Sequence, residues 1–350
     1  MLPWDVSLTR MIVEASLASI SSILAPAGIC HNTLKLAVAP KLLEMDFPVR
    51  VRGIFQNTAS PVSCGVMLEP TTRIQTTAGP VIAVYDSGGI GPSLVLVHAA
   101  GLCGAVLQPL AAHLSGHFSC VLIDERAHGE STAPSDGDFG WYGFAQDILE
   151  VVDTLGLKRP LGFGHSAGGA SLLLAEERRG GTFSALYCYE PVVFPSEEPM
   201  PPGLEGNHLA RRTLRRRSSF KSYDEAYRAV ALKEPFSLFT EECLHLYVEN
   251  GFRESSSSGI VLKCKREHES AIYAHGLAHD AFKNLPKVAC PVVLACGSQD
   301  DYLGEDVQRM FEARLPDSRV EVFDGLGHFG PVQDPKRVAD SIIRAFGPTN

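Results

Sequence analysis

The sequence predicts an α/β fold in which a mostly parallel central sheet is flanked by helices. Short apolar runs at 93–98, 119–124, 161–165 and 185–190 each end at a polar residue or a glycine. Unbroken apolar runs of this length are typical of parallel strands that are buried on both faces. Helical patterns alternate with these runs. Such alternation indicates parallel strands joined by right-handed crossovers.

Bulk composition is that of an ordinary globular protein, and it excludes several function classes. The 350 residues are 45% hydrophobic and carry a formal net charge of −9. This charge offers no electrostatic basis for binding nucleic acid, so no nucleic-acid partner is expected. The nine cysteines form no C-x-x-C pair, and no cysteine–histidine spacing suits a metal site. We therefore expect reduced thiols, no metal and a cytoplasmic location.

Residues 1–70 are expected to form an N-terminal extension whose role the sequence does not reveal. Its most apolar stretch, 11–30, is interrupted by Glu14 and Pro26, so no stable membrane insertion is expected. A small-residue site, "LAPAG", follows a segment in which Arg10 is the single positive charge. One positive charge is weak support for a targeting peptide, which is the alternative interpretation of this stretch.

Two segments, 71–190 and 286–350, are predicted to build one α/β domain. In the first, 142–157 carries apolar residues at helical spacing, with Gly156 where a helix end favours glycine. In the second, strand patterns at 290–297 and 318–325 precede a helical pattern at 334–346. The pattern of the first segment therefore resumes in the second.

Between these segments, residues 191–285 predict a mostly helical insertion. The stretch opens with five prolines and continues with charged segments that have helical patterns. Its arginine cluster at 211–217 is expected to be a solvated helix face, because charge runs usually are. The serine-rich segment 255–259 has the composition of a loop.

Ser166 stands at a predicted strand-to-helix turn, in the pattern G-x-S-x-G formed by residues 164–168. Such a turn strains the serine backbone and lifts the hydroxyl clear of the sheet. The residues two before and two after must then be very small, as Gly164 and Gly168 are. The following helix directs the partial positive charge of its N-terminus toward the serine. Ser166 is therefore the candidate nucleophile.

A serine nucleophile needs a base, and the base needs an acid that orients it. Asp300 follows the predicted strand 290–297, and His328 lies in the loop after the strand 318–325. Both leave the carboxyl ends of strands, the sheet edge on which Ser166 stands. We therefore predict a triad of Ser166, His328 and Asp300.

With these residues in place, the chain resembles the α/β-hydrolase fold superfamily, in its cap-bearing esterase, C–C hydrolase and haloperoxidase-like branch. "DERAHGES" (124–131) is similar to the family's D-x-R-G-H-G-x-S loop. "GLGHFGPVQDP" (325–335) is similar to its histidine loop, and "LVHAAG" (96–101) to its oxyanion loop. The likeness covers 71–190 and 286–350, with 191–285 as the cap. These motifs are specific for the fold and much less so for the substrate.

The resemblance implies a role for each member of the triad. Ser166 would be the nucleophile and His328 the general base and then acid, while Asp300 would fix the imidazole tautomer. Two rival acids stay open: Asp301 is the neighbour of Asp300, and Glu190 ends the run 185–190. Some members of the fold place the acid after that strand, so Glu190 is either the acid or a residue near the pocket.

The resemblance also implies an oxyanion hole built from the backbone N–H groups of Ala167 and Ala100. The family usually has His-Gly at the start of the oxyanion loop, where this chain has His98-Ala99. The extra methyl group is tolerated only if the φ angle of Ala99 is negative. His165, beside the serine, is expected to be a packing residue.

The expected activity is hydrolysis of a small to medium carboxylic ester or lactone through an acyl-enzyme, with no cofactor. An apolar pocket under the cap would select this small-molecule substrate. The same triad would also serve a C–C bond hydrolase or a cofactor-free haloperoxidase or perhydrolase. A third possibility is a receptor-like protein that binds ligand with little turnover. The sequence does not predict the oligomeric state.

Overall fold

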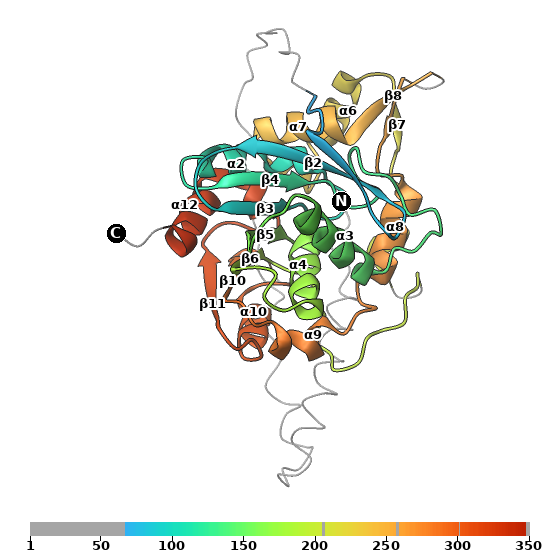
Figure 1. Ribbon diagram of the computed structural model, residues 1–350. Coiled ribbons are helices and arrows are strands. Elements are labelled where there is room, and N and C mark those ends of the chain that lie inside the picture. Colours follow the sequence, from blue (N-terminus) through green and yellow to red (C-terminus); the bar gives the residue numbers. More distant parts are fainter. Residues whose placement is uncertain (1–66, 205–206, 257–258, 301, 348–350) are drawn as a thin grey trace, which may run out of the picture. The chain divides into compact units, whose positions relative to one another are not determined.

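The computed structural model describes residues 67–204, 207–256, 259–300 and 302–347. Most of residues 1–70, with the targeting and membrane expectations placed there, lie outside this part, as does Asp301. An eight-stranded sheet forms the centre of the fold (Figure 1). Its strands are β1 (Thr72–Gln75), β2 (Val81–Gly88), β3 (Ser93–Val97), β4 (Ser119–Ile123), β5 (Leu161–His165), β6 (Ala185–Tyr189), β10 (Val292–Gly297) and β11 (Ser318–Phe323).

The sheet is mostly parallel, as predicted. Its strand order is β1-β2-β4-β3-β5-β6-β10-β11. Antiparallel pairing is confined to β1 with β2 and β2 with β4, while the remaining pairs are parallel. All six strands predicted from apolar runs are parallel members of this sheet. Their carboxyl ends therefore meet along one edge.

Helices cover both faces of the sheet, which explains why its central strands are apolar on both sides. Leu94 and Leu96 of β3 join the core under α2 (Gln108–Leu114) and α12 (Pro335–Phe346). Val95 and Val97 of the same strand join the core on the opposite face. The helices of that face are α3 (Trp141–Thr154), α4 (Ala167–Arg178) and α10 (Glu305–Glu312). Two short helices, η2 (Gly104–Leu107) and α11 (Gly330–Gln333), lie in connections.

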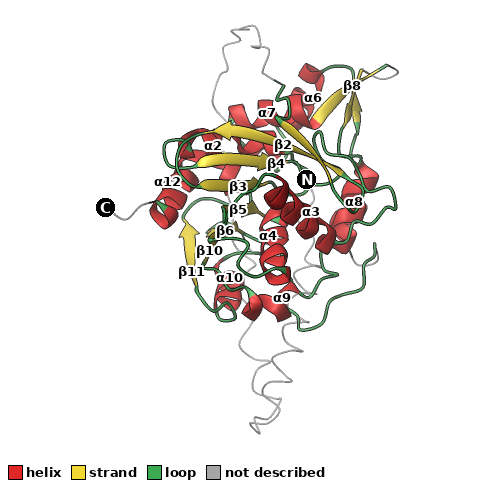
Figure 2. Ribbon diagram, viewed as in Figure 1, coloured by secondary structure: helices red, strands yellow, loops and turns green. Residues whose placement is uncertain are grey.

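The regular structure of the insertion 191–285 consists mainly of short helices, but the segment also contains a small antiparallel sheet that was not predicted from the sequence. Figure 2 shows these strands apart from the main sheet. The first and last residues of the serine-rich segment predicted as a loop, Ser255 and Gly259, belong instead to two of these strands and pair with each other. The strands are β7 (Ser219–Phe220), β8 (Phe252–Ser255) and β9 (Gly259–Leu262), and the helices are α5 (His208–Thr213), α6 (Tyr223–Val230), η3 (Phe236–Leu238), α7 (Glu241–Gly251), α8 (Arg266–His275), α9 (Ala281–Asn284) and η4 (Leu285–Lys287).

Hydrogen bonds join the insertion to α3 of the core. The indole N–H of Trp141, in α3, donates to the carbonyl of Ile272, in α8, at 3.0 Å. The Tyr142 hydroxyl bonds the carboxylate of Asp280. In the part of the chain that the structure describes, all seven cysteines are buried and free of disulfides. No helix in that part has the length and apolar character needed to cross a bilayer.

Candidate active site

The turn between β5 and α4 holds Ser166 in a strained conformation, with φ 57° and ψ −114°. A Cβ atom on Gly164 would lie 2.5 Å from the carbonyl oxygen of Gly168. One on Gly168 would lie 2.5 Å from the carbonyl oxygen of Val97. Real Cβ atoms do not approach backbone oxygens this closely, so the turn requires glycine at both positions. The strained serine and its two small neighbours form the predicted elbow.

His328 connects the serine to an acid. Its Nε2 atom lies 3.0 Å from the Ser166 hydroxyl oxygen, within hydrogen-bonding distance. The residue stands in the loop after β11, and 23% of its side chain is exposed. The serine is 7% exposed. This geometry suits a base that takes the serine proton during attack on a substrate.

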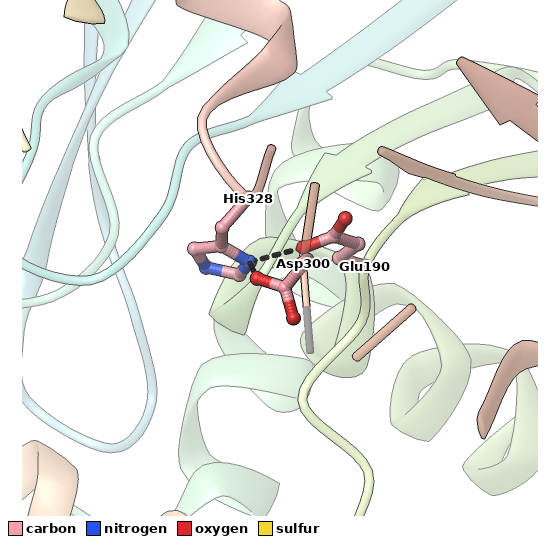
Figure 3. A group of neighbouring side chains, drawn as sticks. All are labelled: Glu190, Asp300 and His328. Atoms are coloured by element: carbon pink, nitrogen blue, oxygen red, sulfur yellow. Dashed lines mark hydrogen bonds and ion pairs between the residues drawn. The ribbon is translucent and has the colours of Figure 1, made fainter. Parts of the chain in front are cut away.

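Two carboxylates face the other ring nitrogen of His328 (Figure 3). Glu190 Oε2 lies 2.6 Å from Nδ1 and makes a hydrogen bond. Asp300 Oδ2 lies 4.0 Å from the same nitrogen, too far for one. The geometry therefore favours Glu190 as the direct partner of His328, whereas the sequence predicted Asp300 in that role with Glu190 as a rival.

The local structure explains why Glu190 is the nearer acid. It follows β6, which lies between β5 and β10 in the sheet, so its backbone starts one strand closer to Ser166 than Asp300 does. Its second oxygen, Oε1, accepts the backbone N–H of Gly297 at 2.8 Å. Asp300 Oδ1 instead accepts the N–H groups of Tyr302 and Leu303, both at 2.7 Å. Those bonds hold the aspartate in its own turn.

The charges around His328 shift its proton affinity. Burial disfavours the charged imidazolium, but the hydrogen bond and the charge of Glu190 outweigh burial, and Asp300 adds to them. The pKa of His328 is therefore raised above its ordinary value. A raised pKa makes the imidazole a stronger base toward the serine hydroxyl.

The expected oxyanion loop continues from the end of β3, and the buried side chains of His98 and His128 hydrogen-bond its backbone. His98 Nδ1 bonds its neighbour's carbonyl, that of Ala99, at 2.8 Å, and His128 Nε2 accepts the N–H of Gly101 at 2.9 Å. Ala99 keeps φ outside the positive region, as its methyl group requires. The N–H of Ala100 has no acceptor among the described residues. It is therefore available to a ligand.

The two expected oxyanion donors come from different elements. Ala167 is the first residue of α4, and the first N–H groups of a helix have no partner inside it. Ala100 comes from the oxyanion loop, and Gly168 packs against the start of that loop at Val97 and His98. From the insertion, the Tyr273 hydroxyl donates to the Ala100 carbonyl at 3.3 Å. The insertion thus reaches the loop directly.

Glu190, Asp300 and His328 also form the one group of metal-ligand type found in the described residues, with ligand atoms within 4.8 Å of one another. Both ring nitrogens of His328 are already engaged, by Glu190 and by Ser166. The arrangement therefore fits a proton relay better than a metal centre.

The sequence is similar to those of known hydrolases. A model of the alpha/beta hydrolase family matches residues 94–341. The 2-(acetamidomethylene)succinate hydrolase of Mesorhizobium japonicum is 32% identical over 87 residues, which are 25% of this chain and 31% of that protein. The match thus spans less than a third of that relative's length.

Solved structures share the fold over most of the chain. The crystal structure of E-2-(acetamidomethylene)succinate hydrolase superimposes with a TM-score of 0.66 at 21% identity, covering 78% of this chain and 97% of the other. A thermophilic esterase from Thermogutta terrifontis does so with a TM-score of 0.60 at 20% identity, covering 78% and 97%. At these identities the likeness demonstrates the fold and not the substrate.

Proposed function

The chain belongs to the alpha/beta hydrolase family, and on that premise we propose that it is a serine hydrolase of carboxylic esters or lactones. One observation carries the proposal: an unbroken hydrogen-bond chain from Ser166 through His328 to Glu190, with links of 3.0 and 2.6 Å. A serine, an imidazole and a buried carboxylate in this order are the components of an activated nucleophile.

In the first half of the reaction, the Ser166 oxygen attacks the substrate carbonyl while His328 Nε2 accepts the hydroxyl proton. The carbonyl oxygen becomes an oxyanion, and the N–H groups of Ala100 and Ala167 donate to it. The loss of one such donor typically lowers kcat by about 10²- to 10³-fold. His328 then gives its proton to the leaving alkoxide, and the acyl group remains on Ser166.

In the second half, water replaces the alcohol. His328 takes a proton from water, and the resulting hydroxide attacks the acyl carbonyl at the same site. The second tetrahedral intermediate collapses, Ser166 regains its proton from His328, and the carboxylic acid leaves. Each step uses groups of this chain, so the proposed reaction includes no cofactor.

We assign the acid role to Glu190 and a supporting role to Asp300. Glu190 fixes Nδ1–H of the imidazole and stabilises the imidazolium that forms when Nε2 accepts the serine proton. Asp300, at 4.0 Å, adds a second negative charge without bonding the ring. This assignment replaces the sequence-based expectation that Asp300 is the direct partner.

The chemistry of the site supports the proposed substrate class. Ser166 and its oxyanion donors serve acyl transfer, and the named structural neighbours include an esterase. The hydrogen bond from Tyr273 to the Ala100 carbonyl supports a role for the insertion in contacting the acyl or alcohol group of the substrate.

A substrate panel tests the proposal. Purified protein is assayed with p-nitrophenyl acetate and butyrate, γ-butyrolactone, a vinylogous keto acid and a peracid-forming mixture. We expect turnover of an ester or lactone, and a loss of about 10³-fold or more in Ser166→Ala. Ser171→Ala is the matched control, since this serine of α4 bonds Glu125 and not His328.

The panel also has outcomes that contradict the proposal. Equal ester hydrolysis by wild type and Ser166→Ala would show that the serine is not the nucleophile. Turnover confined to the keto acid or the peracid mixture would move the reaction to one of the other chemistries expected of this triad. Tight ligand binding without turnover would support the receptor-like alternative.

A further inference from the structure

Two buried side chains hold the backbone of the loop that carries His328. His165 Nε2 donates to the carbonyl oxygen of His328 itself at 2.7 Å. The hydroxyl of Tyr189 donates to the carbonyl oxygen of Gly327, the preceding residue, at 3.0 Å. Both side chains are fully buried. They come from the last residues of β5 and β6, which are paired across the sheet.

The hydrogen-bonding state of His165 follows from its partners. A carbonyl oxygen can only accept, so Nε2 must carry the proton. The other ring nitrogen, Nδ1, is buried and has no partner among the described residues. Burial, with the nearby His328 adding to it, holds the pKa of His165 well below its ordinary value, so the ring is neutral.

An orphaned ring nitrogen is an unfavourable feature for a residue that only fills space. Burying a polar atom without a partner costs free energy, and a phenylalanine ring would fill a similar volume without that cost. What histidine supplies here, and phenylalanine cannot, is the N–H donor to His328. The geometry therefore gives His165 a positioning role beyond the packing role expected from the sequence.

The hydrogen bond from His165 to the His328 carbonyl connects the segments that carry the proposed nucleophile and base. His165 directly precedes Ser166, so it links the nucleophile's strand to the backbone of the base. His328 lies in a loop, and its distance from Ser166 therefore depends on how that loop is held. A misplacement of about 1 Å in a catalytic group can lower the rate by about 10²-fold.

We propose that His165 and Tyr189 are positioning residues that together fix the His328 loop, so that Nε2 stays within reach of Ser166. This inference rests on the proposed function, in which His328 is the base. Neither residue is proposed to touch substrate. Loss of either donor should therefore lower kcat and leave KM nearly unchanged.

The test compares two substitutions of His165. His165→Phe removes the donor and keeps an aromatic ring, whereas His165→Gln keeps an N–H donor near the place of Nε2. We expect kcat for ester hydrolysis to fall about 10- to 100-fold in His165→Phe, with KM within about twofold. His165→Gln should recover most of that loss. Tyr189→Phe should lower kcat by a smaller factor, since it leaves the His165 bond intact.

Tyr187→Phe is the matched control. It removes a buried hydroxyl from the same strand, but that hydroxyl bonds Ser341 of α12 at 2.8 Å and not the histidine loop. We expect it to keep wild-type kcat. Thermal melting of every variant separates positioning from unfolding. If His165→Phe does not fold, His165→Gln and Tyr189→Phe carry the comparison.

Two results overturn the inference, and they differ from failure of the proposed function. Equal kcat in wild type, His165→Phe and Tyr189→Phe would show that the loop needs neither donor. A rise in KM with unchanged kcat would place these residues in substrate binding. If the wild-type activity does not depend on Ser166, the proposed function fails first and the positioning role fails with it.

Discussion

At the scale of single residues, the two carboxylates beside His328 differ in how they act on its ring. Glu190 makes the hydrogen bond, while Asp300 contributes charge from 4.0 Å. Both carboxylates favour the imidazolium, which is why the pKa of His328 is raised against the effect of burial. The serine can lose its proton only to a neutral imidazole. The pH dependence of the reaction should therefore show how far the two carboxylates raise the pKa of His328.

We predict that kcat/KM falls with acidity through a pKa above the usual histidine value of about 6.5. Protonation of His328 removes the base, so activity is present above this pKa and lost below it. Asp300→Asn removes one negative charge and lowers the pKa of His328. Its acid limb should therefore move to lower pH, by about half a unit to one unit.

Profiles of kcat/KM measured between pH 4.5 and 9 check this prediction. Asp153→Asn is the control, because it removes a carboxylate that pairs with Arg179 on the surface. It should leave the acid limb in place. An Asp300→Asn profile that coincides with wild type would mean that Asp300 does not influence the imidazole.

At the scale of elements, the sequence was most informative where local rules dominate. The parallel strands were predictable because they are unbroken apolar runs, and α3 and α12 because their apolar residues recur at helical spacing. The strands β7 to β9 were not, since they span two to four residues each, too few for a period-2 pattern to show. The elbow was predictable because its glycines are required by contacts within the turn itself.

Gly168 of α4 lies against the backbone of Val97 and His98, at the start of the expected oxyanion loop. A Cβ at Gly168 would lie 2.5 Å from the carbonyl oxygen of Val97, so Gly168→Ala must displace either the helix or the loop. Overpacking of this kind costs about 1–3 kcal/mol of unfolding free energy. We expect that loss together with a fall in kcat, because the two proposed oxyanion donors, Ala100 and Ala167, would move apart.

Urea unfolding and ester hydrolysis measure the two effects. Gly180→Ala is the control, because the nearest atom to its added Cβ would be 4.0 Å away. If Gly168→Ala matches this control in both stability and kcat, the close approach has no bearing on the oxyanion hole.

At the scale of the whole molecule, the sheet order determines which acid reaches the base. The sequence placed the candidate acids after two different strands, but it contains no local signal for how near each strand end lies to β5. The order β5-β6-β10 gives that answer. Glu190 then extends from the nearer strand with the longer side chain. The choice between the acids was therefore a question of tertiary structure, while Ser166 and His328, the proposed nucleophile and base, stand in local motifs.

The insertion was the least predictable part for the same reason. Its expected boundaries rest on the break in strand–helix alternation, whereas its contacts with the core depend on long-range packing. Tyr273 bonds Ala100, a residue 173 positions earlier in the chain. Likewise, Trp141 bonds Ile272 across 131 positions. Neither pair has a spacing or motif that a sequence pattern could reveal.

The most direct test of the central claim is the rate at which a fluorophosphonate labels the protein, followed by intact mass. We predict one adduct on wild type and none on Ser166→Ala. Glu190→Gln should label at least about 10²-fold more slowly, and Asp300→Asn less than about tenfold more slowly. Slow labelling of Asp300→Asn with near-normal labelling of Glu190→Gln would assign the acid role to Asp300, which follows β10. Equal labelling of wild type and Ser166→Ala would contradict the claim that this serine is the activated nucleophile.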